Sequence, residues 1–298
     1  MTIPEDISTI AMRHAGRDEA LLPRFKIYSS DTPTELMTLI YDPVACLVLR
    51  GKKRTIIGSE ILEYGPGDCM IVAAEVVAMG QISEASPETP FLCVNLYLDA
   101  EQVSRLLADM ASVKMPGAAI AAGFEISKAS PLLLDTWRRM VELLERPFEI
   151  PVMASHVEHE LLFRLLTGPQ GRLLRQMSGA DSRLSHIRRA MKWIRANYTV
   201  RLRVEALAEI AEMSVSVFHR RFKAVTGQSP LQYQKHIRLH EARRRIVATN
   251  AKAASVAFAV GYESTSQFSR EYKRLFGVPP RRDALGLLSA TDDNSAGH

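Results

Sequence analysis

The chain has 298 residues, of which 47% are apolar, and 38 Lys and Arg against 33 Asp and Glu give a formal net charge of +5. This length suffices for two domains, each with a hydrophobic core. Three cysteines without CxxC spacing argue against a disulfide framework or a zinc site. The first residues lack the apolar stretch of a signal peptide, and no apolar run reaches the roughly 20 residues of a membrane span. We therefore expect a soluble, cytoplasmic protein without a membrane partner.

The charge is divided unevenly along the chain. From Ser182 to the C-terminus, 21 Lys and Arg stand against 9 Asp and Glu, whereas the preceding part has 17 against 24. A basic domain joined to an acidic one indicates nucleic-acid binding at one end only. If the positive charge served only solubility, its restriction to residues 182–298 would have no explanation.

Short strands are predicted in the N-terminal part, from about residue 26 to residue 99. Apolar and β-branched runs alternate there with turns that contain Gly, Pro, Asp or Ser, as in a small antiparallel barrel or sandwich. The runs are residues 44–49, 54–57, 60–64, 70–73 and 91–98.

Helical spacing follows at residues 100–110, 131–145 and 151–167, the last of which is stopped by Gly168-Pro169. The second and third helices are expected to form an antiparallel pair beside the barrel. Periodicity leaves open whether this pair only covers the sheet or also forms a dimer seam. The polar residues 170–182 are interpreted as the linker.

The C-terminal domain, residues 183–284, is predicted to contain only helices, and the polar tail 285–298 is expected to be disordered. The expected helices are residues 182–197, 204–211, 215–226, 229–249, 253–260 and 265–276.

One pattern of residues occurs twice in this domain, fifty positions apart. Ser214, Ser216, Phe218, Arg220, Lys223, Gly227 and Pro230 recur as Ser264, Ser266, Phe268, Arg270, Lys273, Gly277 and Pro280. Two copies are too few for a solenoid, and they indicate a protein that contacts something twice at a fixed separation. Before the internal turn the offset is one residue smaller, so the second turn is one residue longer. We therefore expect the two units to present their helices at different angles.

The second helix of each unit has an apolar and a basic side. Phe218 and Phe222 are four residues apart and are expected to face inward, as are Phe268 and Tyr272. The other side is small, polar or basic, with an Arg at the same place in both copies. This suits a helix in the major groove, where Arg can pair with guanine. A solvated helix has a similar composition, but the recurring Arg favours DNA.

Residues 229–249 would form a helix about 31 Å long, close to the roughly 34 Å of one turn of B-DNA. It could therefore set two recognition helices into successive major grooves. Its basic residues are expected to flank phosphates or, in part, to pair with Glu241. They are Lys235, Arg238, Arg243, Arg244 and Arg245.

The sequence from Ile187 to Pro280 resembles the AraC/XylS family of bacterial transcription regulators. The resemblance rests on Met213-Ser214, Phe218 to Lys223, Thr226-Gly227, Ser229-Pro230, Ala259 to Tyr262, Phe268 to Arg270 and Phe276 to Pro280. It implies a DNA-binding domain of two helix-turn-helix units joined by a long helix. One residue departs from the pattern, since Glu212 stands where the first turn usually has Gly and is less comfortable at positive φ.

The resemblance also implies which side chains contact DNA. The base-contacting residues would be Ser216, His219 and Arg220 in the first unit and Thr265, Ser266, Ser269 and Arg270 in the second. Phosphate contacts are expected from Ser214, Lys223, Ser264, Lys273, Arg243 and Arg244. Because the two base-facing sets differ, the expected DNA site is two dissimilar boxes one turn apart.

Residues 1–169 are similar to a family subgroup with a cupin-like N-terminal domain, through Gly51 to Arg54, Glu63 to Gly67 and Ala85 to Pro87. The fold class that follows is α+β with two domains: a small antiparallel cupin-like β-barrel with flanking helices, and an all-α domain. The resemblance implies that the first domain senses a small molecule and dimerises.

The strand region has no histidine between His14 and His156, which argues against a metal-dependent cupin enzyme. His156, His159 and Glu160 do not follow the H-E-x-x-H order of a zinc protease and are interpreted as an exposed helix face. We therefore predict no metal, no cofactor and no enzymatic activity.

Two further groups of residues each allow two interpretations. Cys46, Cys69 and Cys93 are either small buried core residues or pocket thiols that sense an electrophile or oxidant. Lys52, Lys53 and Arg54 are either the turn of an exposed hairpin, which we favour, or the rim of an anion site.

Three functional classes remain: a ligand-responsive DNA-binding regulator, an enzyme with a DNA-binding appendage, and an architectural DNA binder. The missing histidines weigh against the second, and the separate acidic β domain weighs against the third. The expected partners are promoter DNA, RNA polymerase, an unidentified small-molecule effector and a second copy bound through residues 131–167.

Overall fold

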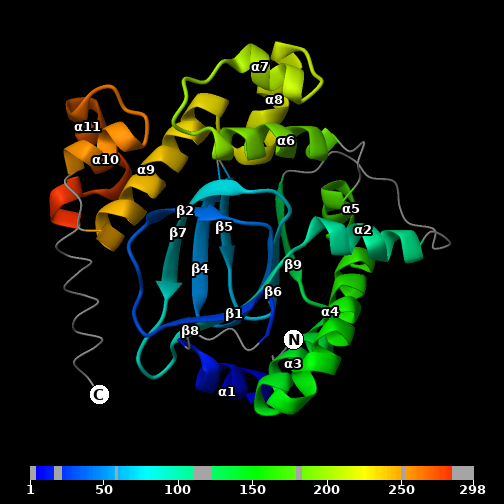
Figure 1. Ribbon diagram of the computed structural model, residues 1–298. Helices are drawn as coiled ribbons and strands as arrows, with labels where there is room; N and C mark the ends of the chain where they lie inside the picture. Colours follow the sequence, from blue (N-terminus) through cyan, green and yellow to red (C-terminus); the bar gives the residue numbers. More distant parts are fainter. Residues whose placement is uncertain are drawn as a thin grey trace. The chain divides into compact units, whose positions relative to one another are not determined.

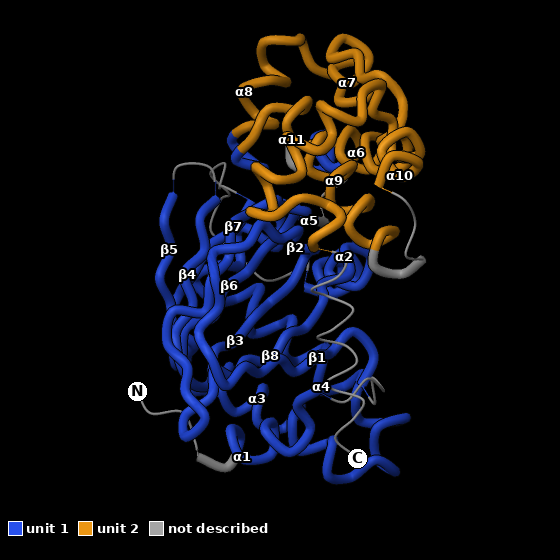
Figure 2. The backbone as a smooth tube through the Cα atoms, turned by 90° about the vertical axis from the view of Figure 1, so that its left-hand side faces the viewer, with its two compact units in different colours: residues 1–188, 224–227 blue, residues 189–223, 228–298 orange. Residues whose placement is uncertain are grey.

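The computed structural model describes residues 5–16, 22–57, 60–110, 123–178, 183–249 and 253–283. The chain forms two compact units (Figure 2): residues 1–188 with 224–227, and residues 189–223 with 228–298. Within the described ranges, no helix combines the length and the apolar character that crossing a membrane requires. The predicted disordered tail lies outside the described residues.

The first unit contains two antiparallel sheets (Figure 1), which confirms the predicted antiparallel β domain. One sheet has the strand order β1-β8-β3-β6-β9 and the other has the order β2-β7-β4-β5. The strands are β1 (Phe25–Ser30), β2 (Met37–Tyr41), β3 (Val44–Arg50), β4 (Lys52–Ile57), β5 (Glu60–Tyr64), β6 (Asp68–Val72), β7 (Val76–Glu84), β8 (Phe91–Tyr97) and β9 (Phe124–Lys128).

Alternation along the strands explains which side chains fill the space between the sheets. In β4, Thr55 and Ile57 are buried, while Lys52 and Arg54 on the other face are exposed. β3 is buried on both faces, because its outer face is covered by helix. Val44, Cys46 and Val48 belong to the core between the sheets, and helix α1 (Glu5–His14) contacts β3 and β8 from outside.

Helices cover one side of this unit (Figure 1). They are α2 (Ala100–Asp109), α3 (Pro131–Glu142), α4 (Ile150–Thr167) and α5 (Gly171–Ser178), with short 3-10 turns at Leu143–Glu145 and Pro147–Glu149. Ser130 caps α3 by accepting a hydrogen bond from the Leu133 amide at 3.2 Å. Trp137 of α3 is fully buried, with its ring 6.2 Å from that of Phe25.

The predicted linker at residues 170–182 was wrong for most of its length. Residues 171–178 form α5, which packs against α2 and α4. Gln170 is buried and donates hydrogen bonds to the carbonyl oxygens of Cys69 at 2.9 Å and Glu125 at 2.7 Å. These contacts bind the segment to the first unit, and residues 179–182 lie outside the described part.

The C-terminal helices follow the predicted order and confirm the all-α domain. They are α6 (Arg183–Ala196), α7 (Val204–Ile210), α8 (Val215–Thr226), α9 (Pro230–Thr249), α10 (Ala253–Ala259) and α11 (Thr265–Phe276). With its 20 residues, α9 is about 30 Å long at 1.5 Å per residue. It joins α7 and α8 to α10 and α11, and it contacts both α10 and α11.

Candidate DNA-binding surface and ligand cavity

The buried sides of α8 and α11 are built alike. The rings of Phe218 and Phe222 are 5.4 Å apart, and those of Phe268 and Tyr272 are also 5.4 Å apart. All four side chains are at most 1% exposed. Because residues four apart lie on one side of a helix, these pairs fix which side turns outward.

The outward sides carry the residues predicted to contact bases. Thr265 is partly buried, and the others are exposed: Ser216, His219, Arg220, Ser266, Ser269 and Arg270. Ser214, Lys223, Ser264 and Lys273, which were predicted to contact phosphate, are exposed as well. The Ser264 hydroxyl also caps α11, accepting a hydrogen bond from the Gln267 amide at 3.3 Å. These residues form a surface that DNA can reach, and the individual contacts stay predictions.

The turns within the two units differ as the sequence indicated. Four residues separate α7 from α8, and five separate α10 from α11. Glu212 has φ of 52° and Gly261 has φ of 90°, so both turns use the left-handed region. The expectation that Glu212 sits in a conformation that favours glycine is therefore confirmed. Its carboxylate lies 2.8 Å from Arg189 Nη2.

Arg238 of α9 connects the segment before the first helix-turn-helix unit to the turn of the second. Its guanidinium donates hydrogen bonds to the carbonyl oxygens of Tyr198 at 2.6 Å, Val200 at 3.1 Å and Gly261 at 2.9 Å. Gln234, one turn earlier, also donates to the Tyr198 and Val200 carbonyls. α9 is thereby tied to the segment before α7 and to the turn before α11.

Other basic residues of α9 are paired within the protein. Arg243 Nε lies 2.8 Å from Asp283 Oδ2. The Arg243 guanidinium carbon also lies 4.8 Å from the centre of the Phe276 ring. Arg243 was predicted to contact phosphate; its guanidinium is bound by Asp283 in this structure, and the phosphate contact stays a prediction. Arg244 also pairs with Glu241, at 2.8 Å, but its side chain stays 72% exposed. It can still reach a phosphate.

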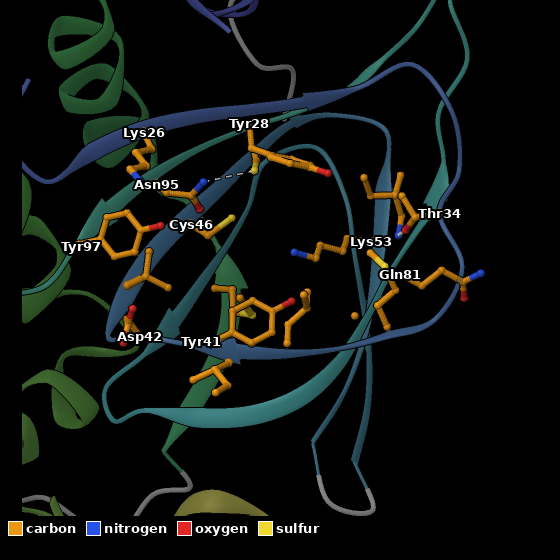
Figure 3. Close-up of a pocket in the computed structure, with 18 of the residues that line it drawn as sticks. Lys26, Tyr28, Thr34, Tyr41, Asp42, Cys46, Lys53, Gln81, Asn95 and Tyr97 are labelled. Carbon is orange, nitrogen blue, oxygen red and sulfur yellow. Dashed lines mark hydrogen bonds between the residues drawn. The ribbon is translucent and has the colours of Figure 1, made fainter. Parts of the chain in front are cut away.

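A cavity of about 340 Å³ lies between the two sheets of the first unit (Figure 3). This is within the roughly 300–1,000 Å³ of small-molecule sites. Its polar lining includes Lys26, Tyr28, Thr34, Tyr41, Asp42, Lys53, Gln81, Asn95 and Tyr97, with the thiols of Cys46 and Cys93. Its apolar lining includes Ile27, Met37, Leu39, Ile40, Val44, Met70 and Ile82.

The three consecutive basic residues of β4 have different roles. Lys52 forms an ion pair with Glu84 at 2.7 Å, and Arg54 pairs with Glu63, both outside the cavity. Lys53 points into the cavity, with its ammonium 5.1 Å from the centre of the Tyr41 ring (Figure 3). Our preference for an exposed turn was therefore wrong for Lys53. The pKa of Lys53 is raised: burial by itself would lower it, but Tyr41, Tyr64 and the two cavity thiols raise it by more.

The cysteines divide between two environments. Cys46 and Cys93 line the cavity, whereas Cys69 does not, so the structure removes Cys69 from the predicted pocket thiols. A hydrogen bond from Cys46 lowers the pKa of Cys93, with help from the Lys53 charge and from Asn95, whose amide lies 3.6 Å from its sulfur. The same bond and burial raise the pKa of Cys46. Burial raises the pKa of Cys69 to about 12.

The helical histidines behave as an exposed face. His156 and His159 are exposed on α4, and Glu160 is paired with Arg139 at 2.7 Å. Among the described residues, no group of three His, Cys, Asp or Glu side chains could hold a metal ion.

Several cavity residues were missed at the level of sequence, among them Tyr41, Asn95 and Tyr97. Tyr41 and Tyr97 each stand at the end of a strand, and Asn95 interrupts the apolar run of β8. A polar residue within a buried strand was the signal that could have indicated Asn95.

Known proteins match both parts of the chain. Residues 21–173 match the model of the AraC-type transcriptional regulator N-terminus, and residues 207–283 match a helix-turn-helix domain. The first match spans half of the chain. The chain belongs to the AraC-type transcriptional regulators.

The similar relatives are regulators too. An AraC-like transcription regulator of Streptomyces lividans is 33% identical over 141 residues, which are 47% of this chain and 46% of the relative. The transcriptional activator RhaS of Escherichia fergusonii is 27% identical over 155 residues, 51% of this chain and 55% of RhaS. The chain thus spans about half the length of these curated relatives.

A solved structure shares the fold. ToxT from Vibrio cholerae, bound to (E)-4-(8-methylnaphthalen-1-yl)but-3-enoic acid, has a TM-score of 0.59 and 11% identity, covering 88% of this chain and 97% of ToxT.

Proposed function

We propose that the protein is a ligand-responsive transcriptional regulator that binds promoter DNA through α8 and α11. The observation that carries this proposal is the pair of exposed helix faces, each with an Arg at the equivalent place, that a single helix of about 30 Å holds together. Helices at this separation can enter successive major grooves on one side of DNA. The family membership supports the same role.

The cavity between the sheets is the proposed effector site. Its lining combines apolar side chains, which offer contact area, with polar and charged ones, which can fix the orientation of a small molecule. ToxT, which shares the fold, was solved with a small organic acid bound. An effector here would alter DNA binding by favouring one arrangement of the two units over others.

We further propose that the protein dimerises through the exposed side of α4 and the turn just before it. Phe148, just before α4, is 82% exposed, and Val152 and Met153 in its first turn are 63% and 41% exposed. The exposed His156 and His159 follow Val152 on the same side of the helix. The opposite side of α4 is buried against α3 and α5. A second copy of the same helix would cover the exposed side, as in an isologous interface. The similarity to the activator RhaS supports activation as the direction of regulation, for which RNA polymerase is the partner we propose.

The test is selection of bound genomic fragments by the full chain, followed by footprinting with Arg220→Ala and Arg270→Ala. Each substitution should weaken specific binding by about 1–3 kcal/mol and relax base choice at one position, because a bidentate Arg contact to guanine is lost. Lys192→Ala, an exposed change on α6, is the charge-matched control. Insertion of half a helical turn between the two boxes should abolish binding by one protomer. A wild-type footprint from the Arg220/Arg270 double variant would contradict the proposal.

A further inference from the structure

The cavity contains a charged donor, Lys53, that forms no ion pair with the described residues and contacts the Tyr41 ring. None of the ion pairs among the described residues includes Lys53, although its neighbours Lys52 and Arg54 are both paired. Its ammonium is directed into the space between the sheets (Figure 3). A buried charge normally has a counter-charge or hydrogen-bond partners, because its desolvation is otherwise costly.

A second donor lies beside it. The Tyr41 hydroxyl is buried and has no hydrogen-bond partner among the described residues, and buried polar groups without partners are rare. Gly80 of β7 lies next to both groups and makes room for the Tyr41 hydroxyl. A Cβ at this position would lie 2.8 Å from that hydroxyl, which is too close, and 3.7 Å from Lys53 Cε, which is an ordinary contact. The missing side chain therefore lets the Tyr41 hydroxyl occupy its place beside Lys53.

The rest of the cavity differs from this end in charge and polarity. Asp42, the carboxylate among the lining residues, lies beside Tyr97 at the other end (Figure 3), where it helps burial to raise the pKa of Tyr97. Part of the wall is formed by aliphatic and thioether side chains such as Leu39, Val44 and Met70, beside polar ones such as Gln81 and Asn95. The aliphatic and thioether side chains offer contact area to an apolar group and no hydrogen bonds.

We infer that Lys53 and Tyr41 together hold the anionic head of the effector, a small carboxylate with an apolar body. The carboxylate would accept hydrogen bonds from the ammonium and from the phenol, which satisfies both donors at once. The apolar body would lie along the aliphatic walls. This inference rests on the proposed role of the cavity as the effector site.

The test measures binding of three probes of equal chain length to the full protein by isothermal titration calorimetry. They are octanoate, octan-1-ol and octylammonium, which differ only in the head group. Octanoate should bind at least about tenfold tighter than octan-1-ol, since hydrogen bonds to a charged group are the stronger ones, and octylammonium should bind weakest. Equal affinity for octanoate and octan-1-ol, or no binding of any probe, would overturn the inference.

Variants locate the head group. Lys53→Met keeps the length of the side chain and should remove the preference for octanoate, while Lys52→Met, the same change on the outer face of β4, should retain it. Tyr41→Phe removes only the hydroxyl and should weaken octanoate by about three- to tenfold without affecting octan-1-ol. Circular dichroism checks that each variant is folded. A wild-type preference in Lys53→Met would place the anion elsewhere and end the proposal.

Because these titrations contain no DNA, they separate the two proposals. If octanoate binds through Lys53 but leaves DNA affinity unchanged, the anion site stands and the effector role is contradicted. If DNA affinity responds to neutral compounds and octanoate does not bind, the effector role stands and the anion site is contradicted.

Discussion

Glu212 and Gly261 occupy the same place in the two helix-turn-helix units, and both adopt positive φ. A residue with a side chain is strained there, whereas glycine is not. Glu212 gains an ion pair with Arg189, but the pair is exposed on both sides and contributes little. Gly261 has a second constraint, since a Cβ would approach the Thr199 carbonyl oxygen to 2.5 Å.

We therefore predict opposite effects of substitution at these two positions. Glu212→Gly should raise the free energy of unfolding by about 1 kcal/mol, because glycine removes the strain of a left-handed conformation. Gly261→Ala should lower it by about 2 kcal/mol or more, because the methyl group meets the backbone. Urea denaturation of the full chain, followed in the transition of the DNA-binding unit, measures both. If Glu212→Gly instead lowered the free energy of unfolding, the backbone at Glu212 would not be strained.

Cys93 and Cys69 make a second contrast between single residues. The pKa of Cys93 is lowered by its hydrogen bond from Cys46, and Cys93 faces the cavity, whereas burial raises the pKa of Cys69 to about 12. Because the thiolate is the nucleophile, iodoacetamide should label Cys93 first and Cys69 last in the folded protein. Peptide mass spectrometry over time gives the order. If a promoter under this regulator responds to an electrophile, Cys93→Ser should blunt the response and Cys69→Ser should not; unchanged responses in all three Cys→Ser variants would exclude thiol sensing.

The sequence predicted the position of side chains best in the two helix-turn-helix units, because the same residues recur at equivalent places in both. The recurrence of Arg220 as Arg270 and of Phe218 as Phe268 fixed the inner and outer sides of α8 and α11 without a structure. No such comparison existed for Cys69 and Cys46, which lie in strands buried on both faces. Alternation is lost in such strands, so the sequence could not show which thiol faces the cavity.

At the level of elements, α9 holds two histidines in its partly buried side. Burial lowers the pKa of His236 to about 4, and the charges of Lys235 and Arg274 act in the same direction. Burial also lowers the pKa of His240 to about 4, with His236 and Arg243 contributing. One ring nitrogen of each has no partner among the described residues. The folded state thus holds both rings neutral.

This arrangement predicts a loss of stability in acid. In the unfolded chain the rings take up protons near the usual value of 6.5, while in the folded protein they do so only near pH 4. Stability is therefore complete above about pH 6.5 and is lost as the pH falls towards 4, by up to about 3 kcal/mol for each ring. Thermal unfolding between pH 7.5 and 4 measures the slope. The His236→Leu/His240→Leu variant should flatten it, and His219→Gln, an exposed change, should not.

The elements that were mispredicted share a cause. Helix α5 was interpreted as linker because Gly171 and Ser178 frame a polar segment, yet Leu173, Leu174 and Met177 are at most 1% exposed. Strands β1, β2, β7 and β9 were not among the predicted runs: β1 and β9 mix polar with apolar residues, and Gly80 interrupts the apolar part of β7. In each case contacts with distant residues, such as Gln170 with Cys69, decide the structure and leave little local pattern.

For the whole molecule, the apolar side of α4 predicts the oligomeric state. Phe148→Asp and Val152→Asp should each weaken self-association by at least about tenfold, because a charge would be buried at the seam. Ile61→Asp, which is 64% exposed on β5, is the matched control and should associate like the wild type. Sedimentation velocity over a range of protein concentrations distinguishes these outcomes. A wild-type protein that stays monomeric at cellular concentrations would refute the dimer.

The bonds of Arg238 have a consequence for the DNA itself. By holding the carbonyl group of Tyr198, in the segment before α7, and that of Gly261, in the turn before α11, this one guanidinium resists movement of the second helix-turn-helix unit relative to that segment. The connecting helix α9 is about 30 Å long, somewhat shorter than the roughly 34 Å pitch of straight B-DNA. If the protein does not deform, the DNA must bend or overtwist so that both recognition helices can enter successive major grooves. Base pairs between the two boxes would then be selected for how easily they deform, although no side chain contacts them.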